Sequence, residues 1–207
     1  MFSKSVITIG NVKTTSLPHT SGSLPEERRL VWQAKSGDAE AFAQLYDAYV
    51  ERVYRYIYFR VTDDTLAEDL TSQVFLKAWE SLDGYQAGGS PYLAWLYTVA
   101  KNLVIDYYRS RRQTVDLDEA VHLAADTPTP DEEAQGRSEQ RDMREALQRL
   151  TDEQQQVLIL RFISGLSTEE TAAAMGKRSG AVRALQMRAL QTLSKHMQEK
   201  EIHHERS

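Results

Sequence analysis

The sequence predicts an all-α protein of two small helical domains, joined by a flexible acidic linker, with a helix-turn-helix in the second domain. Three observations carry this prediction. Apolar residues recur every three or four positions through most of the chain, and no stretch shows the sustained alternation of a strand. Ser, Thr, Asp, Gly and Pro stand where these stretches begin and end. Residues 113–133 include seven acids and no basic residue, and they separate two basic stretches.

Composition narrows the class of protein before any motif is considered. The 207 residues are 41% hydrophobic and 27% charged, which is ordinary for a globular protein. The chain has no cysteine, which excludes disulfides and thiolate catalysis and favours the reducing cytoplasm. The longest mainly apolar run, 94–100, is far shorter than the roughly 20 residues of a membrane span, and no secretory signal is recognisable. A net charge of −5 argues weakly against an autonomous nucleic-acid binder, so the distribution of charge matters more.

The first domain is expected over 26–112, after a flexible N-terminal extension over 1–25. A short helix over 26–35 ends near a glycine, and Asp38 is placed to cap the second helix. The spacing from Thr65 to Glu68 matches a capping box that opens the third helix. The second helix presents one face of residues at helical spacing: Phe42, Leu45, Tyr49, Val53, Tyr56 and Arg60.

The fourth helix follows a loop marked by glycines. Ser90 as the cap and Pro91 at the first helical position form a typical helix start. The helix continues to a basic end at 109–112. Lys101 and Arg112 project within about 20° of each other, and Arg109 lies about 80° away. Aromatic residues beside such a basic track suit unstacked nucleic-acid bases, although a basic helix end can also be a simple dipole pairing.

An acidic linker is expected over 113–136, and the second domain over 137–197 with a frayed tail over 198–207. Capping boxes open helices after Thr151 and after Ser167. A tight turn over 176–178 then leads to a last helix that Ser179 caps and that reaches about Met197.

A short helix, a tight turn and a longer basic helix form the pattern of a helix-turn-helix. On the last helix Val182, Leu185, Ala189 and Leu193 face inward at helical spacing. The outward residues are small or basic, which suits the major groove and its phosphates: Gly180, Arg183, Ala184, Met187 and Arg188. A helical hairpin with a solvated basic face is the alternative. The absence of any acid over 176–195 favours DNA binding.

Four stretches, in this order, resemble the extracytoplasmic-function (ECF) group of the bacterial sigma-70 family, which keeps only regions 2 and 4. They read FAQLYDAYVERVYRYIYFRV, AEDLTSQVFLKAW, WLYTVAKNLVIDYYRSRR and LTDEQQQVLILRFISGLSTEETAAAMGKRSGAVRALQMRAL. The resemblance covers about 26–112 and 137–195. It implies a promoter-specificity subunit that binds core RNA polymerase and directs initiation at −10 and −35 promoter elements, helping to open the −10 region.

The resemblance also assigns roles to residues. Contacts with the β′ clamp helices of core polymerase fall on Glu68, Asp69, Gln73 and Lys77. Contacts with the −10 element fall on Tyr85, Tyr92, Trp95, Lys101, Asn102, Arg109 and Arg112. Contacts with the −35 element fall on Arg178, Ser179, Arg183, Ala184, Met187 and Arg188. Region 4 also touches the polymerase β flap, and an anti-sigma factor is an expected partner.

The sequence departs from many relatives at three places, namely Ser72–Gln73, the loop over 87–90 and the groove positions over 184–187. The promoter sequence is therefore left open. A DNA-binding regulator that acts without polymerase remains the alternative, although it leaves the aromatic and basic first domain unexplained. An enzyme is disfavoured because the five histidines form no HExxH pattern and no nucleophile elbow or phosphate loop occurs. No metal or cofactor is expected.

Overall fold

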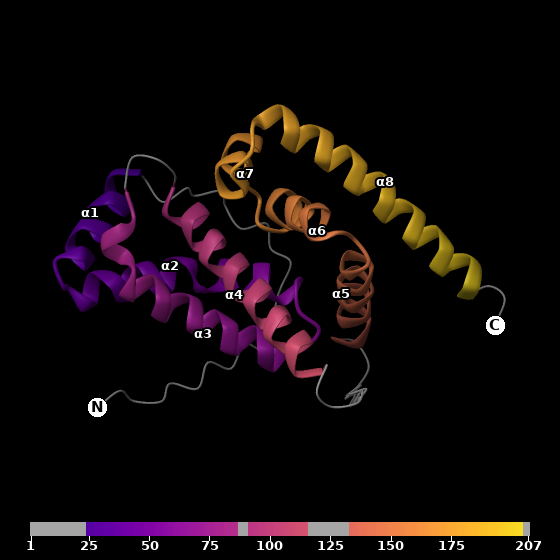
Figure 1. Ribbon diagram of the computed structural model, residues 1–207, viewed down its shortest axis with the longest axis horizontal. Coiled ribbons are helices and arrows are strands. Elements are labelled where there is room, and N and C mark those ends of the chain that lie inside the picture. Colours follow the sequence, from indigo (N-terminus) through magenta and orange to yellow (C-terminus); the bar gives the residue numbers. More distant parts are fainter. Residues whose placement is uncertain (1–23, 87–90, 116–132, 205–207) are drawn as a thin grey trace.

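The structure is a computed structural model that describes residues 24–86, 91–115 and 133–204. Every regular element within these ranges is helical, which confirms the all-α prediction (Figure 1). The first domain contains α1 (Leu24–Lys35), α2 (Ala39–Tyr58), α3 (Asp64–Glu80), a 3₁₀ turn η1 (Leu82–Gly84) and α4 (Tyr92–Val115). The second contains α5 (Glu133–Gln148), α6 (Asp152–Leu158), a π turn η2 (Ile159–Ile163), α7 (Thr168–Met175) and α8 (Ser179–His204).

The two helical groups lie against each other. In Figure 1, α1 to α4 form a bundle, α7 lies over one end of α4, and α8 runs along the outside with its C-terminal end projecting away. Contacts join α4 to α7 and α2 to η2, so elements far apart in sequence meet. The buried apolar residues of both domains form one continuous cluster.

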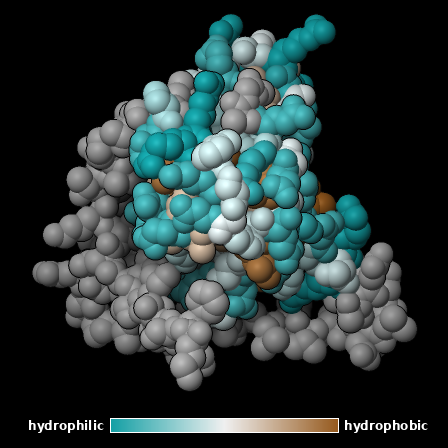
Figure 2. Space-filling model, turned by 90° about the vertical axis from the view of Figure 1, so that its left-hand side faces the viewer, coloured by the Kyte–Doolittle hydropathy of each residue, from teal (hydrophilic) through white to brown (hydrophobic). Residues whose placement is uncertain are grey.

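Helical periodicity correctly predicts the two cores. In α2 the residues Leu45, Tyr49, Val53 and Tyr56 are buried, as their spacing requires. In α8 the residues Val182, Leu185 and Ala189 are buried and Leu193 is partly buried. Seen from the α1 end, the coloured residues are mainly hydrophilic, with a few apolar residues among them (Figure 2).

Three predicted caps are confirmed, and two are wrong, at Thr65 and at Ser179. Asp38 accepts hydrogen bonds from the backbone N–H groups of residues 40 and 41. Thr151 and Ser167 each form a complete capping box. Thr65 does not cap α3, because Asp63 is the N-cap and accepts from the N–H of Leu66. Asp is as good a cap as Thr, and it stands two residues earlier, so the helix starts at 64.

The last helix differs from its prediction at both ends. Ser179 is the first helical residue and not its cap, and α8 continues to His204 through the polar residues expected to fray. The tight turn is confirmed, since Gly176 ends α7 with φ of 62°. Ser90, the predicted cap of α4, lies outside the described residues. Helix also extends into the expected linker from both sides, to Val115 and from Glu133.

Candidate nucleic-acid and polymerase interfaces

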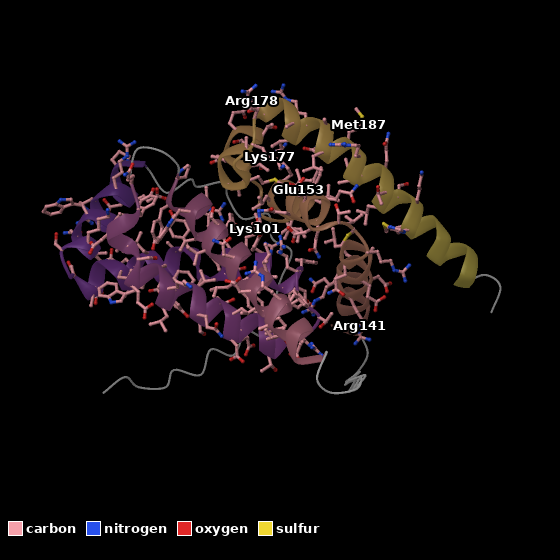
Figure 3. All side chains as sticks on the ribbon, in the orientation of Figure 1. Lys101, Arg141, Glu153, Lys177, Arg178 and Met187 are labelled. Atoms are coloured by element: carbon pink, nitrogen blue, oxygen red, sulfur yellow. The ribbon has the colours of Figure 1, made fainter. Side chains whose placement is uncertain are left out.

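The first turns of α8 bring the predicted −35 residues onto one exposed face. Gly176 reverses the chain after α7, so that α8 starts at the surface. Arg178 and Met187 point away from the body of the domain (Figure 3). The residues Arg178, Arg183, Ala184, Met187 and Arg188 are exposed, and Ser179 is partly exposed. A Cβ added at Gly180 would meet no atom of another part of the chain within 4 Å, so this side of the first turn is accessible to a groove.

Arg183 of this face forms only a long, solvent-exposed ion pair. Arg183 lies 3.8 Å from Glu169 of α7, and both side chains are 69% exposed. An ion pair of this length and exposure contributes little to stability. The guanidinium of Arg183 is therefore available to a base or a phosphate.

Glu153 of α6 is an acid among cations, which the sequence pattern did not single out. Its carboxylate lies 2.7 Å from the ammonium of Lys177. This hydrogen bond and the nearby charges of Lys101 and Arg188 hold the pKa of Glu153 below its usual value, so the group stays ionised. Figure 3 shows Lys101, Glu153 and Lys177 close to one another, although Lys101 belongs to the first domain. The sequence pattern gave no signal for this arrangement, because Glu153, Lys177 and Lys101 belong to three different helical segments.

The predicted −10 aromatics form a packed cluster. Tyr85 and Tyr92 are buried, and Trp95 is half-buried with its ring centroid 5.2 Å from that of Tyr85 and 5.4 Å from that of Tyr92. The carboxylate of Glu27 accepts hydrogen bonds from the N–H of Tyr92 and from the hydroxyl of Tyr49. An acid that the sequence pattern did not identify thus holds the start of α4.

Burial also sets the ionisation of these phenols. Desolvation raises the pKa of Tyr85 to about 12, and the nearby charge of Glu27 adds to the effect. Desolvation likewise raises the pKa of Tyr92. Both hydroxyls are neutral at physiological pH. Because Trp95 alone of the three is partly exposed, its ring is the accessible stacking surface of the cluster.

The polar residues predicted to follow the −10 strand lie further along α4. Lys101 is half-buried, whereas Asn102 and Arg109 are exposed. Arg109 lies 3.4 Å from Asp106 in a surface ion pair. The side chain of Arg112 lies outside the described residues. The predicted −10 residues therefore fall into two groups: a packed aromatic cluster formed by Tyr85 and the start of α4, and polar residues further along α4.

The predicted core-polymerase residues share the exposed side of α3. Glu68, Asp69, Gln73 and Lys77 are all exposed, and the opposite side of the helix is buried. Leu76 is 60% exposed between them. The sequence analysis missed this residue, although an apolar residue off the inner stripe of the helix was the available signal.

The described residues give two further findings. No group of three or more His, Asp or Glu side chains among them is placed to hold a metal ion. None of the described helices is both long and apolar enough to cross a membrane.

Comparisons with known proteins match the two helical groups separately. The family model of Sigma-70 region 2 matches residues 45–114, and that of Sigma-70, region 4 matches residues 140–193. The ECF RNA polymerase sigma factor BldN of Streptomyces coelicolor is 40% identical over 168 residues, covering 80% of this chain and 64% of BldN. The ECF RNA polymerase sigma factor SigX of Bacillus subtilis is 33% identical over 166 residues, covering 77% of this chain and 84% of SigX.

A solved structure is similar over both domains. The sigma factor RpoE, in complex with the anti-sigma factor NepR from Bartonella quintana, superposes with a TM-score of 0.65 at 26% identity. The match covers 77% of this chain and 98% of the RpoE chain.

Proposed function

Because the chain belongs to the ECF RNA polymerase sigma factors of the sigma-70 family, we propose that it is a promoter-specificity subunit that binds core RNA polymerase and directs transcription initiation. The first domain, over 26–112, binds polymerase and opens the −10 element. The second, over 137–197, reads the −35 element. The observation that carries this proposal is the exposed face of α8, which offers Arg183, Arg188 and small residues on a helix whose other side is buried, with Arg178 in the turn just before it.

The −35 element is read from this face of α8. Arg183 and Arg188 reach base edges or phosphates in the major groove, and the small Ala184 lets the helix backbone approach. The positive end of α8, next to Arg178 and Ser179, favours a phosphate. A bidentate arginine contact with a base discriminates by about 1–3 kcal/mol. The net charge of −5 is compatible with this role, because polymerase presents the helix to DNA.

The −10 element is opened at the start of α4. Flipping a base costs a few kcal/mol, so a preformed stacking surface has to offset it. Trp95 offers that surface, and the buried Tyr85 and Tyr92 hold its ring in place. Lys101, Asn102, Arg109 and Arg112 then follow the strand along the helix.

Polymerase binds the exposed side of α3. Glu68, Asp69, Gln73 and Lys77 surround Leu76, so an apolar contact is framed by charges that select the partner. The β′ clamp helices are the expected partner of this side, and the β flap is the partner of region 4. An anti-sigma factor that covers these surfaces is a further partner, as NepR is for RpoE.

Sigma factors are initiation factors and not enzymes. We propose the same for this chain, with no catalysis of its own, no cofactor and a place of action in the cytoplasm.

Run-off transcription tests the proposal. Core polymerase from the source organism, with and without the purified chain, is assayed on genomic fragments. Discrete transcripts are expected only when the chain is present, and Arg183→Ala with Arg188→Ala is expected to abolish them. Lys195→Ala, an exposed cation further along α8, is the matched control. A chain that binds DNA fragments but yields no transcript would instead be an independent DNA-binding regulator.

A further inference from the structure

We propose that helix α1 positions the stacking surface for the −10 element, with Glu27 and Lys35 fixing the two ends of the segment that joins η1 to α4. We name this pair of side chains the α1 brace. The inference rests on the proposed function, because opening of the −10 element is the step in which the ring of Trp95 is used. The apolar spacing of the sequence gave no signal for either residue of the brace.

Lys35 fixes the end of η1. Its ammonium donates to the carbonyl of Asp83 at 3.1 Å and to the carbonyl of Tyr85 at 2.5 Å. Carbonyl groups at the end of a helical turn have no partner within that turn, and a cation beside them is favourable. The two carbonyls belong to residues 48 and 50 positions later in the chain, so the contact ties α1 to a separate part of the domain.

Glu27 fixes the start of α4. Pro91 has no N–H group, so the N–H of Tyr92 is the first backbone donor at this end of the helix. It donates to Oε1 of Glu27 at 3.2 Å, and the hydroxyl of Tyr49 donates to Oε2. Each carboxylate oxygen therefore has a donor of its own, which fixes the orientation of the group. A negative charge at the N-terminus of a helix is also favourable.

Helix α1 is itself fixed to the core of the domain. Leu30, Val31 and Ala34 are buried, and α1 packs against α2 and η1. Glu27 and Lys35 are eight residues apart, which is about 12 Å along the helix axis. Because the rise per residue of an α-helix is constant, the two charges stand at a fixed separation. The brace is therefore a rigid support whose cation meets carbonyls and whose carboxylate meets an N–H.

The brace acts on Trp95 through two tyrosines. Lys35 holds the backbone of Tyr85. Glu27 holds the backbone of Tyr92. The ring centroids of these tyrosines are 5.4 Å apart, and that of Trp95 lies 5.2 and 5.4 Å from them. A stacking surface that is ordered before the base arrives loses less conformational freedom on binding, so the brace favours base capture by preorganisation.

Promoter opening measures the positioning role. Core polymerase of the source organism with the purified chain is assayed by permanganate reactivity on a promoter found by run-off transcription, well below the unfolding temperature of every variant. Glu27→Gln has one acceptor oxygen in place of two, and Lys35→Met removes the donor. Each is expected to lower opening about three- to tenfold while co-elution with polymerase is kept. Glu26→Gln and Arg29→Met, which remove the same charges at exposed positions of α1, are expected to leave opening unchanged.

Amide hydrogen exchange in the free chain tests the brace without polymerase. Exchange of the Tyr92 N–H, followed by NMR, is expected to be about three- to tenfold faster in Glu27→Gln, because the N–H loses a charged acceptor. Glu26→Gln is expected to leave this exchange unchanged. Circular dichroism establishes that each variant is folded. If Glu27→Gln unfolds, Glu27→Asp replaces it, since the shorter side chain does not reach both donors.

The outcomes separate the brace from the proposed function. Equal opening in wild type, Glu27→Gln and Lys35→Met overturns the positioning role. A parallel loss of opening and of polymerase co-elution in folded variants indicates a structural role alone and also overturns it. If the wild type opens no promoter, the proposed function fails together with the positioning role. Exchange of the Tyr92 amide then decides by itself whether α1 holds the start of α4.

Discussion

Replacing Arg183 with Ala is expected to weaken binding of the sigma–polymerase complex to promoter DNA by about 1–3 kcal/mol, or roughly 5- to 150-fold. The fold is expected to be almost unaffected. Arg183 is 69% exposed, and its pair with Glu169 is 3.8 Å long. Surface pairs of this kind contribute about 0–1 kcal/mol to the free energy of unfolding. The loss of DNA affinity therefore exceeds any loss of stability.

Anisotropy of a labelled promoter fragment at increasing salt distinguishes two ways in which Arg183 acts. A lost phosphate contact reduces the slope of log K against log salt by about 0.9. A lost base contact leaves the slope unchanged and relaxes discrimination at one base pair. Lys195→Ala removes the same charge about 18 Å further along α8 and is expected to have a smaller effect. Unchanged affinity, slope and discrimination in Arg183→Ala would refute the assignment of this face to the −35 element.

Three further predictions concern the first domain, the turn and pH. Trp95→Ala is expected to lower opening of the −10 region about tenfold, because stacking of one base on an aromatic ring is worth ~1–3 kcal/mol. Permanganate reactivity of the opened thymines measures this opening. Trp32→Ala, at a position that is 70% exposed, is the control. Gly176→Ala is expected to lower the free energy of unfolding by about 1–2 kcal/mol, because Gly176 has a φ of 62°, in the left-handed region. Gly180→Ala, at a position without a positive φ, is the control and is expected to cause no such loss in thermal unfolding. The raised pKa of Tyr85, about 12, stabilises the fold fully below the unfolded value near 10, and this stability is lost as pH rises through 12. In denaturant unfolding between pH 10 and 12, the free energy of unfolding is expected to fall less steeply with pH in Tyr85→Phe than in the wild type. An identical fall in both proteins would contradict the raised pKa of Tyr85.

Local rules predicted most of the helices and the two cores from the sequence. Caps at Asp38, Thr151 and Ser167 were predicted correctly because each side chain bonds within three residues of itself. The error at Thr65 arose because a second good cap, Asp63, stands two residues earlier. The π turn Ile159–Ile163 was not predicted, since it contributes only a small shift to an otherwise helical period.

The contact between the domains could not be predicted, because its residues look like surface residues in the sequence. Periodicity placed Arg60 on the inner face of the second helix, where it is indeed buried, but nothing local identifies Asp152 as its partner. Arg144 is likewise buried by contacts with Val61 and Asp64 around the turn between α2 and α3, which lie 83 and 80 positions earlier. Polar pairs between residues far apart in the chain do not change the spacing of apolar residues, so periodicity does not reveal them.

Co-elution of the purified chain with core RNA polymerase of the source organism on size exclusion tests the central claim most directly. Stoichiometric co-elution is expected, and Asp69→Lys with Lys77→Glu on the exposed side of α3 is expected to abolish it while leaving the fold intact. A folded chain, free of inhibitor, that elutes separately from its cognate core polymerase would contradict the assignment as a promoter-specificity subunit.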